Sequence, residues 1–281
     1  MPRGGAGHAI PATLAGVDVH SLGYRTDLMI RALEGSQIED RDQYVVVRST
    51  QNPGYWWGNF LLLAKPPQPG DVTTWLSVFA GEFPLARHVA LAVDVTEVSA
   101  VDVDEMTGHG LRLQHNAVLT AQDVIEPPRP NTTAVIRPLA GDSDWRQAAE
   151  LRAVVNEGTA GSDPAFLQAR VAAERELTES GYGAWFGAFL DGTLVAQLGL
   201  VSDGGDIARY QNVETHPAAR RQGLAGTLAW QAGQYGLGEL GAGTLVIVAD
   251  PHDIAIRIYR SVGFADAEAQ VGFERQPDDG A

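Results

Sequence analysis

The sequence predicts an α/β protein in which mixed sheets carry helices on their faces, in two tandem domains. With 281 residues, 44% of them hydrophobic, the chain is long enough to build two cores. A proline-rich segment, Glu126-Pro127-Pro128-Arg129-Pro130-Asn131, interrupts it near the middle and can neither continue a helix nor lie inside a sheet. The pattern after this segment is β-α-α-β-β-β-α-β-α-β, which is typical of a mixed sheet covered by helices.

These observations set the predicted domain boundaries. We expect a first domain over residues 1–126, a linker at 127–131, a second domain over 132–275 and a tail at 276–281. Residues 1–16 and the tail have compositions typical of poorly ordered segments. The second domain should begin its sheet near Ala134 and end it near Phe273.

Local signals place the elements of the second domain. Asp163-Pro164 indicates a helix start, with the aspartate as cap and the proline in the first turn. Asp191-Gly192 between two apolar runs predicts a hairpin. Strands are expected at 134–138, 184–190, 193–201, 207–215, 244–249 and 267–273, and helices at 142–156, 163–180, 227–235 and 253–262.

The first half gives weaker signals in a similar order. Strands are expected at 44–48, 60–63, 88–93 and 110–118, with a helix at 72–83. This order echoes the second half but lacks its strand–glycine loop–helix segment, and Gly58-Asn59 does not replace it. We therefore interpret the first half as a degenerate copy of the second.

Composition excludes several classes of protein. The net charge is −15, and neither half has the basic excess that nucleic-acid phosphates require, so no nucleic-acid partner is expected. The absence of cysteine excludes disulfides, thiolate metal sites and a cysteine nucleophile. The seven histidines show no ligand spacing, so no metal is predicted. No signal peptide or membrane-length apolar run is found, and a cytoplasmic location is the default expectation.

The most informative segment is the loop Arg220-Arg221-Gln222-Gly223-Leu224-Ala225-Gly226, which joins a strand to a helix. The first backbone N–H groups of a helix have no partner within it, and the helix dipole favours negative charge at this end. Glycine allows the backbone to approach an anion and to adopt angles that other residues avoid. The loop therefore predicts a phosphate or pyrophosphate site, to which Arg220, Arg221 and the hydroxyl of Thr227 can add contacts.

This loop and a later segment together resemble the GCN5-related N-acetyltransferase (GNAT) family. The family has an (Arg/Gln)-x-x-Gly-x-(Gly/Ala) loop, matched here by Arg220-x-x-Gly223-x-Ala225. About forty residues on, Ala255-Ile256-Arg257-Ile258-Tyr259-Arg260-Ser261-Val262-Gly263-Phe264 matches a second family segment. The resemblance covers about residues 132–275 and implies the acyl-CoA N-acyltransferase fold, with acetyl-coenzyme A as acetyl donor.

The resemblance also implies roles for single residues. The N–H groups of Arg221, Gln222, Gly223, Leu224, Ala225 and Gly226 would hold the coenzyme pyrophosphate. A backbone N–H between Val213 and Thr215 would polarise the thioester carbonyl, and Tyr259 would protonate the leaving thiolate. Many family members have an asparagine where this chain has Asp253, which can cap the helix but departs from the pattern.

Glu214 is the candidate general base. By strand alternation it should share a face with Tyr210 and Asn212, and burial could raise its pKa towards neutrality. The alternative is a carboxylate that binds a cationic substrate or pairs with an arginine such as Arg209. His216 precedes a proline and is interpreted as a loop residue.

The predicted function is acetyl transfer from acetyl-coenzyme A to a primary amine of a small molecule or peptide, by direct attack in a ternary complex. Two alternatives stay open: a tandem transferase with another acyl donor, as in the mycothiol synthases, and a non-catalytic acyl-coenzyme A sensor. The acceptor cannot be deduced from the fold class. A monomer or homodimer without a membrane partner is expected.

Overall fold

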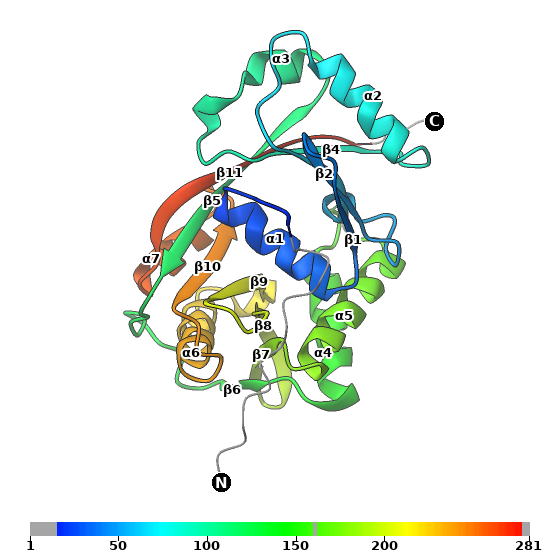
Figure 1. The fold of residues 1–281 in the computed structure, drawn as a ribbon. Helices are drawn as coiled ribbons and strands as arrows, with labels where there is room; N and C mark the ends of the chain where they lie inside the picture. The colour runs from blue at the N-terminus through cyan, green and yellow to red at the C-terminus, as the bar shows by residue number, and fades with distance from the viewer. Residues whose placement is uncertain (1–15, 160–161, 277–281) are drawn as a thin grey trace. The chain divides into compact units, whose positions relative to one another are not determined.

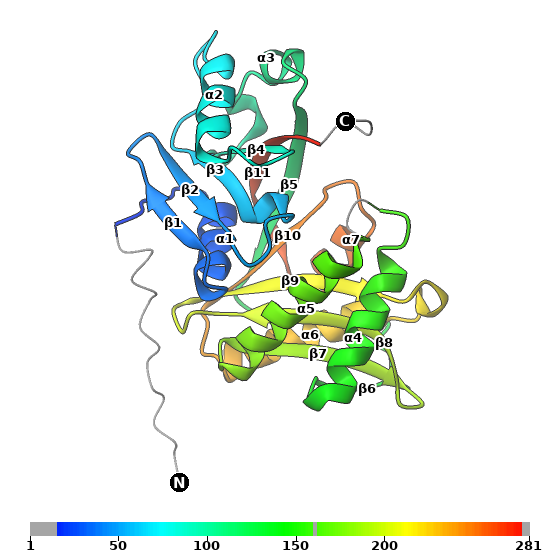
Figure 2. The ribbon, with the colours of Figure 1, turned by 90° about the vertical axis from the view of Figure 1, so that its right-hand side faces the viewer.

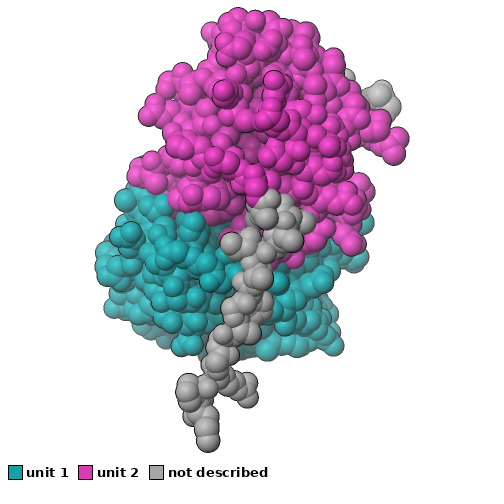
Figure 3. Space-filling view, in the orientation of Figure 1, with its two compact units in different colours: residues 1–15, 120–247, 254–265 teal, residues 16–119, 248–253, 266–281 magenta. Residues whose placement is uncertain are grey.

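The computed structural model describes residues 16–159 and 162–276. The expectations for residues 1–15 and 277–281 lie outside the described residues. The chain forms two compact units, coloured in Figure 3. Among the described residues, unit 1 comprises 120–247 and 254–265, and unit 2 comprises 16–119, 248–253 and 266–276.

Unit 1 contains the predicted loop. Its strands follow the order β6-β7-β8-β9-β10, antiparallel except for the parallel pair β9–β10. The two-residue turn at Asp191-Gly192 joins β7 to β8, as predicted, with φ of 48° and 80° at its two residues. The elements are β6 (Val135–Pro138), α4 (Gly141–Val155), α5 (Pro164–Glu179), β7 (Gly183–Leu190), β8 (Thr193–Val201), β9 (Ile207–Thr215), the 3₁₀ turn η4 (Pro217–Ala219), α6 (Leu224–Gly238), β10 (Thr244–Ala249) and α7 (Ala255–Ser261).

Helices cover both faces of this sheet. Helices α4 and α5 lie over one face of β7–β9, and α6 lies over the other (Figures 1 and 2). The predicted cap of α5 is present, because the Asp163 carboxylate accepts a hydrogen bond from the N–H of Phe166 and Pro164 opens the helix. Trp185 and Leu198 are fully buried between the layers.

Unit 2 repeats this plan. Its strands follow the order β1-β2-β3-β4-β11-β5. Strands β3 and β4 pair in parallel, and α2 connects them along the chain. The elements are α1 (Leu22–Leu33), β1 (Gln37–Asp40), β2 (Tyr44–Arg48), the 3₁₀ turn η2 (Trp56–Gly58), β3 (Asn59–Leu63), α2 (Val72–Glu82), β4 (Val89–Val93), the 3₁₀ turn η3 (Val98–Ala100), α3 (Val103–Gly108), β5 (Arg112–Ala121) and β11 (Ala265–Arg275).

The order of elements confirms the tandem prediction. Unit 2 begins α1-β1-β2-β3-α2-β4-α3-β5, and the second half of the chain reads α5-β7-β8-β9-α6-β10-α7-β11. In both copies three antiparallel strands precede a helix and a parallel strand. Sequence patterns in the first half did not predict α1, β1 and α3.

The last strand differs from the predicted domain plan, which assigned residues up to 275 to the second domain. Strand β11 instead pairs antiparallel with β4 of unit 2, from Val271 opposite Val93 to Arg275 opposite Val89. Val271 and Phe273 are fully buried. An alternating apolar pattern predicts a strand but does not specify which edge it joins, so the sequence could not reveal this partner.

Two helix starts also differ from the predictions. Helix α6 begins at Leu224, three residues before the predicted start, and Gly223 is its N-cap. Helix α7 begins at Ala255 with Ile254 at the N-cap position, one residue after the predicted Asp253. Among the described residues no helix is both long and apolar enough to cross a membrane.

Candidate functional site

The loop before α6 has a backbone suited to binding an anion. Arg221 has φ of 63° and Gly223 has φ of 78°, so left-handed residues lie on both sides of Gln222. When the sign of φ alternates in this way, successive N–H groups point into one concavity. In the described part of the chain, no protein acceptor receives a hydrogen bond from the N–H groups of residues 221–226.

The loop also carries two adjacent arginines. Arg220 and Arg221 are exposed, and neither pairs with a carboxylate among the described residues. Arg220 Nε donates only a long hydrogen bond, 3.4 Å, to the carbonyl of Thr215. Two uncompensated guanidinium groups therefore accompany the unpartnered N–H groups, as the predicted anion site requires.

Thr227 has a different role from the one expected. Its hydroxyl donates to the carbonyl of Gly223, at 2.9 Å, and accepts from the N–H of Asn131, at 2.8 Å. Thr227 is 2% exposed. Its hydroxyl therefore holds the start of α6 to the proline-rich segment instead of pointing to an open site.

Next to the loop, β9 separates from β10. The parallel ladder joins Ile207, Ala208 and Arg209 to β10, and within the described ranges residues 210–215 have no strand partner on that edge. The N–H of His216 donates to the carbonyl of Val195 in β8. Because N–H directions alternate along a strand, the N–H of Thr215 points to the unpaired edge. Val213 and Thr215 thus lie where an extended ligand could pair with the backbone.

A β-bulge in β9 changes the predicted faces. Gly199 pairs with Gln211 but Gln197 pairs with Glu214, so β9 has one extra residue here, and Asn212 adopts a left-handed φ of 46°. Tyr210 points to α6, where its hydroxyl donates to the carbonyl of Ala229. Glu214 points to α4. The prediction that Tyr210 and Glu214 share a face is therefore wrong, because the extra residue reverses the alternation between them.

Glu214 belongs to a buried ionic network. Arg152 of α4 donates from Nε to both oxygens of Glu214, at 3.1 and 3.3 Å, and from Nη1 to Glu174 of α5, at 2.5 Å. Gln197 of β8 donates to Glu214 at 2.6 Å, and Asn212 donates to Glu174 at 2.7 Å. The arginine partner of Glu214 is therefore Arg152 and not Arg209.

Burial dominates the electrostatics of this network. Desolvation raises the pKa of the Glu174 carboxyl above its usual range, although the charges of Arg152 and Arg170 oppose the shift. Burial alone lowers the pKa of Arg152, but the two glutamates outweigh it and raise that pKa. Arg152 Nη2 and Gln197 Oε1 are buried without hydrogen-bond partners.

Sequence reasoning missed Arg152, Glu174 and Gln197. One signal was available in α5, where the buried residues are spaced three or four apart as one helix face: Leu167, Arg170, Val171, Glu174 and Leu177. Charged residues on an otherwise apolar face are rarely buried without a partner. The identity of that partner depends on how α4 and β9 pack, which helical spacing does not specify.

Tyr259 lies in α7 and is 5% exposed. Its backbone carbonyl accepts from the N–H groups of Val262 and Phe264 at the end of the helix. Gly263 reverses the chain there with φ of 109°, and a side chain would crowd the carbonyl of Asp123. The ring of Phe264 contacts that of Tyr210 edge-on, with centroids 5.4 Å apart. The second predicted segment thus packs on the face of β9 that α6 covers.

The equivalent loop of unit 2 cannot hold a pyrophosphate. Between β3 and α2 it contains Pro66, Pro67 and Pro69, which have no N–H to donate. The N–H of Gly70 already donates to Glu105, and Asp71 occupies the N-cap. The anion position at this helix end is therefore filled by the protein's own carboxylates.

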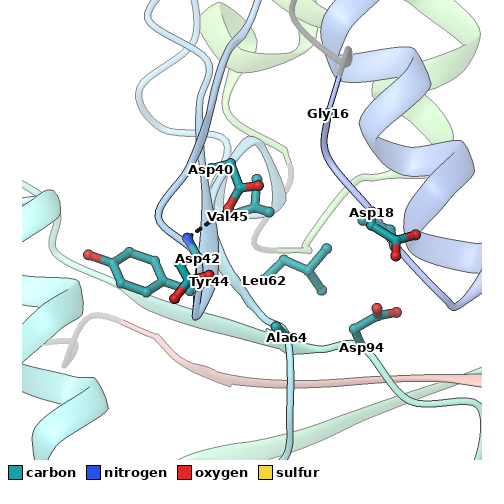
Figure 4. A pocket seen from close by; sticks show the side chains of 10 residues that line it. Gly16, Asp18, Asp40, Asp42, Tyr44, Val45, Leu62, Ala64 and Asp94 are labelled. Carbon is teal, nitrogen blue, oxygen red and sulfur yellow. Dashed lines mark hydrogen bonds between the residues drawn. The ribbon is translucent and has the colours of Figure 1, made fainter.

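An acidic hollow adjoins the ends of β3 and β4 in unit 2 (Figure 4). Its volume is about 140 Å³, and both Asp94 oxygens accept backbone N–H groups, from His20 and Ser21. Its lining combines four aspartates with a mostly apolar wall: Gly16, Asp18, Val19, Asp40, Asp42, Tyr44, Val45, Leu62, Ala64 and Asp94. Such a lining repels a phosphate.

These differences predict one coenzyme site per chain. Calorimetric titration with coenzyme A should give a stoichiometry of about one, because the loop before α6 offers free donors and cations and the equivalent loop before α2 does not. A second site of comparable affinity would contradict this prediction. No group of residues in the described segments is arranged to hold a metal ion.

Comparisons with known proteins agree with the geometry. Residues 148–264 match the model of the Acetyltransferase (GNAT) family. No curated protein matches the sequence significantly. A GCN5-related N-acetyltransferase from Kribbella flavida has a similar structure, with a TM-score of 0.62, 19% identity, and coverage of 93% of this chain and 97% of that chain.

Two further solved structures have the same fold. A tandem GNAT protein from the clavulanic acid biosynthesis pathway aligns with a TM-score of 0.55 and 14% identity, over 97% of this chain and 94% of that chain. A GCN5-related N-acetyltransferase from Sphaerobacter thermophilus aligns with a TM-score of 0.59 and 17% identity, over 85% of this chain and 78% of that chain. Residues 148–264 of this chain form a domain of the GCN5-related N-acetyltransferase family.

Proposed function

We propose that this protein is an acetyl-coenzyme A-dependent N-acetyltransferase whose donor site lies in unit 1. The observation that supports this most is the loop before α6, where unpartnered N–H groups and two unpaired arginines adjoin the unpaired edge of β9. A pyrophosphate fits the loop, and the acyl-bearing arm fits the strand edge, where it can form backbone hydrogen bonds.

In this proposal acetyl-coenzyme A supplies the acetyl group as a thioester. The backbone N–H groups between Val213 and Thr215 face the carbonyl oxygen and stabilise the negative charge that develops on it. The amine nitrogen forms a bond to the carbonyl carbon while the carbon–sulfur bond breaks. Tyr259 gives its phenolic proton to the sulfur, because a phenol keeps its proton at neutral pH.

Glu214 is proposed to act on the acceptor side. Its side chain is 11% exposed and forms an ion pair with Arg152. A carboxylate at this place attracts a cationic amine and can take its proton, directly or through water, before attack. The acceptor is proposed to be a primary amine of a small molecule or peptide.

A screen of amines tests the proposal. Polyamines, amino acids, aminoglycosides and peptide N-termini would be incubated with acetyl-coenzyme A while released thiol is measured. Thiol release that depends on one amine class, with acetylated amine found by mass spectrometry, supports an acetyltransferase. Turnover with another acyl thioester only would favour a transferase with a different donor. Coenzyme binding without turnover on any amine would favour a sensor.

Tyr259→Phe should reduce turnover by roughly 100-fold while coenzyme A affinity stays within about twofold, because only the transferable proton is removed. Steady-state rates and calorimetry on the same preparation measure both quantities. Tyr235→Phe, a change in α6 of the same unit, serves as the matched control and should leave turnover unchanged. Full activity of Tyr259→Phe would exclude this phenol as the proton donor.

A further inference from the structure

The proline-rich segment packs along the proposed donor site instead of connecting two domains freely. Glycines in α6 and directly after α7 make room for this segment and for the residues just before it. A side chain at Gly263 would crowd the carbonyl of Asp123, one at Gly233 would overlap Val124, and one at Gly226 would lie 3.3 Å from Pro127. Val124 and Pro127 are themselves buried.

The closest approach is at the loop itself. A side chain on Gly223 would overlap the carbonyl oxygen of Arg129 and lie 3.2 Å from the backbone nitrogen of Asn131. The sequence suggested that glycine is needed here so that a ligand can approach. The structure shows that the atoms pressed against its α-carbon belong to the protein's own chain.

Asn131 uses all its side-chain polar atoms at this junction. Its Nδ2 donates to the carbonyl of Gln222 at 2.8 Å. Its Oδ1 accepts from the N–H groups of Thr133 and Ala134, at 3.0 and 2.8 Å. The amide oxygen is therefore held by the residues just before β6, while the amide nitrogen binds the loop.

This hydrogen bond determines where the loop donors point. The peptide between Gln222 and Gly223 is trans, so its C=O and N–H groups point in opposite directions. Because Asn131 binds the carbonyl, the N–H of Gly223 is directed away from the segment, to the side that a ligand can reach. Loss of the amide would release the peptide to rotate.

Arg129 adds charge at the same place. Its carbonyl lies against Gly223, its side chain is exposed, and no carboxylate of the described residues pairs with it. Together with Arg220 and Arg221 it makes a third uncompensated cation beside the loop, in a chain whose net charge is −15. An anion bound there would be attracted by all three.

We infer that residues 129–131 are part of the pyrophosphate site, with Asn131 as a positioning residue that orients the loop and Arg129 as a binding residue. This inference rests on the proposed function. According to this inference, residues 129–131 contribute to coenzyme A affinity through the pyrophosphate.

Two ligands separate this role from a purely structural one. Calorimetry would measure the affinity of the full chain for coenzyme A and for pantetheine, which lacks the pyrophosphate. Asn131→Ala should weaken coenzyme A binding about tenfold and leave pantetheine binding unchanged. The control Thr133→Ala alters a residue that touches Asn131 but not the loop, and should change neither affinity.

Arg129→Ala should weaken coenzyme A binding about threefold and reduce its dependence on salt, whereas Arg146→Ala, at an exposed arginine of α4, should not. Equal losses for both ligands, or unchanged coenzyme A affinity in Asn131→Ala, would overturn the inference while leaving the proposed function intact. Failure of the unsubstituted chain to bind coenzyme A would overturn the proposed function, and this inference with it.

Discussion

Replacing Gly223 with alanine is expected to weaken coenzyme A binding by roughly 100-fold or more. The left-handed backbone at this position costs a non-glycine residue about 1–2 kcal/mol, and the added methyl group overlaps the Arg129 carbonyl. The loop and the segment must separate to relieve the overlap. The loss of two or more charge-assisted hydrogen bonds, at about 1.5 kcal/mol each, accounts for the expected affinity change.

Gly241→Ala is the matched control. Gly241 has φ of 69°, close to that of Gly223, but no atom lies within 4 Å of the position that a side chain would take. This substitution should lower the free energy of unfolding by about 1 kcal/mol and leave coenzyme A affinity unchanged. Calorimetry and denaturant unfolding of both variants separate backbone strain from loop displacement. Similar affinities in the two variants would show that the loop does not hold the coenzyme.

Arg152→Met is expected to lower the free energy of unfolding by about 3–5 kcal/mol. The substitution leaves Glu174 and Glu214 buried together without the guanidinium that compensates them, and unpaired buried charges carry this cost. Arg175→Met, at a partly exposed arginine that pairs with Glu179 and Asp142, should leave the free energy of unfolding nearly unchanged, because water screens these pairs. Urea unfolding curves at one pH give both values.

The decrease in the free energy of unfolding caused by Arg152→Met should depend on pH. Burial raises the pKa of Glu174 in the folded protein above its unfolded value, and removing Arg152 takes away the main opposing charge. A group whose folded pKa is raised loses stability as pH increases from the unfolded value through the folded value. The destabilisation should therefore be smaller in acidic solution, close to the ordinary pKa of a carboxyl group, and should increase as the pH rises. A pH-independent loss would indicate lost packing instead of buried charge.

Local chemistry made most of unit 1 predictable. The aspartate–proline start of α5, the hairpin at Asp191-Gly192 and the glycine at the start of α6 are decided by backbone angles and by hydrogen bonds between near neighbours. The loop around Gly223 and the later segment with Tyr259 and Phe264 indicated the family, each from a short run of neighbouring residues. These signals are readable because each depends on only a few consecutive residues.

The candidate site was predicted less completely on its acceptor side. Glu214 was found, but its partner Arg152 comes from another element and its face was reversed by the bulge at Asn212. A bulge adds one residue to one strand without any necessary change in composition, so alternation counted along the sequence fails beyond it.

The sequence by itself determined the repeat of elements, the loop before α6 and its family, because turns, caps and helix faces follow from neighbouring residues. Only the tertiary structure decided that β11 pairs in unit 2, that Arg152 joins Glu174 to Glu214, and that residues 129–131 press against Gly223. Each of these contacts joins segments far apart in the chain. The physical reason is that periodicity states which face of an element is buried, whereas packing selects the element that buries it.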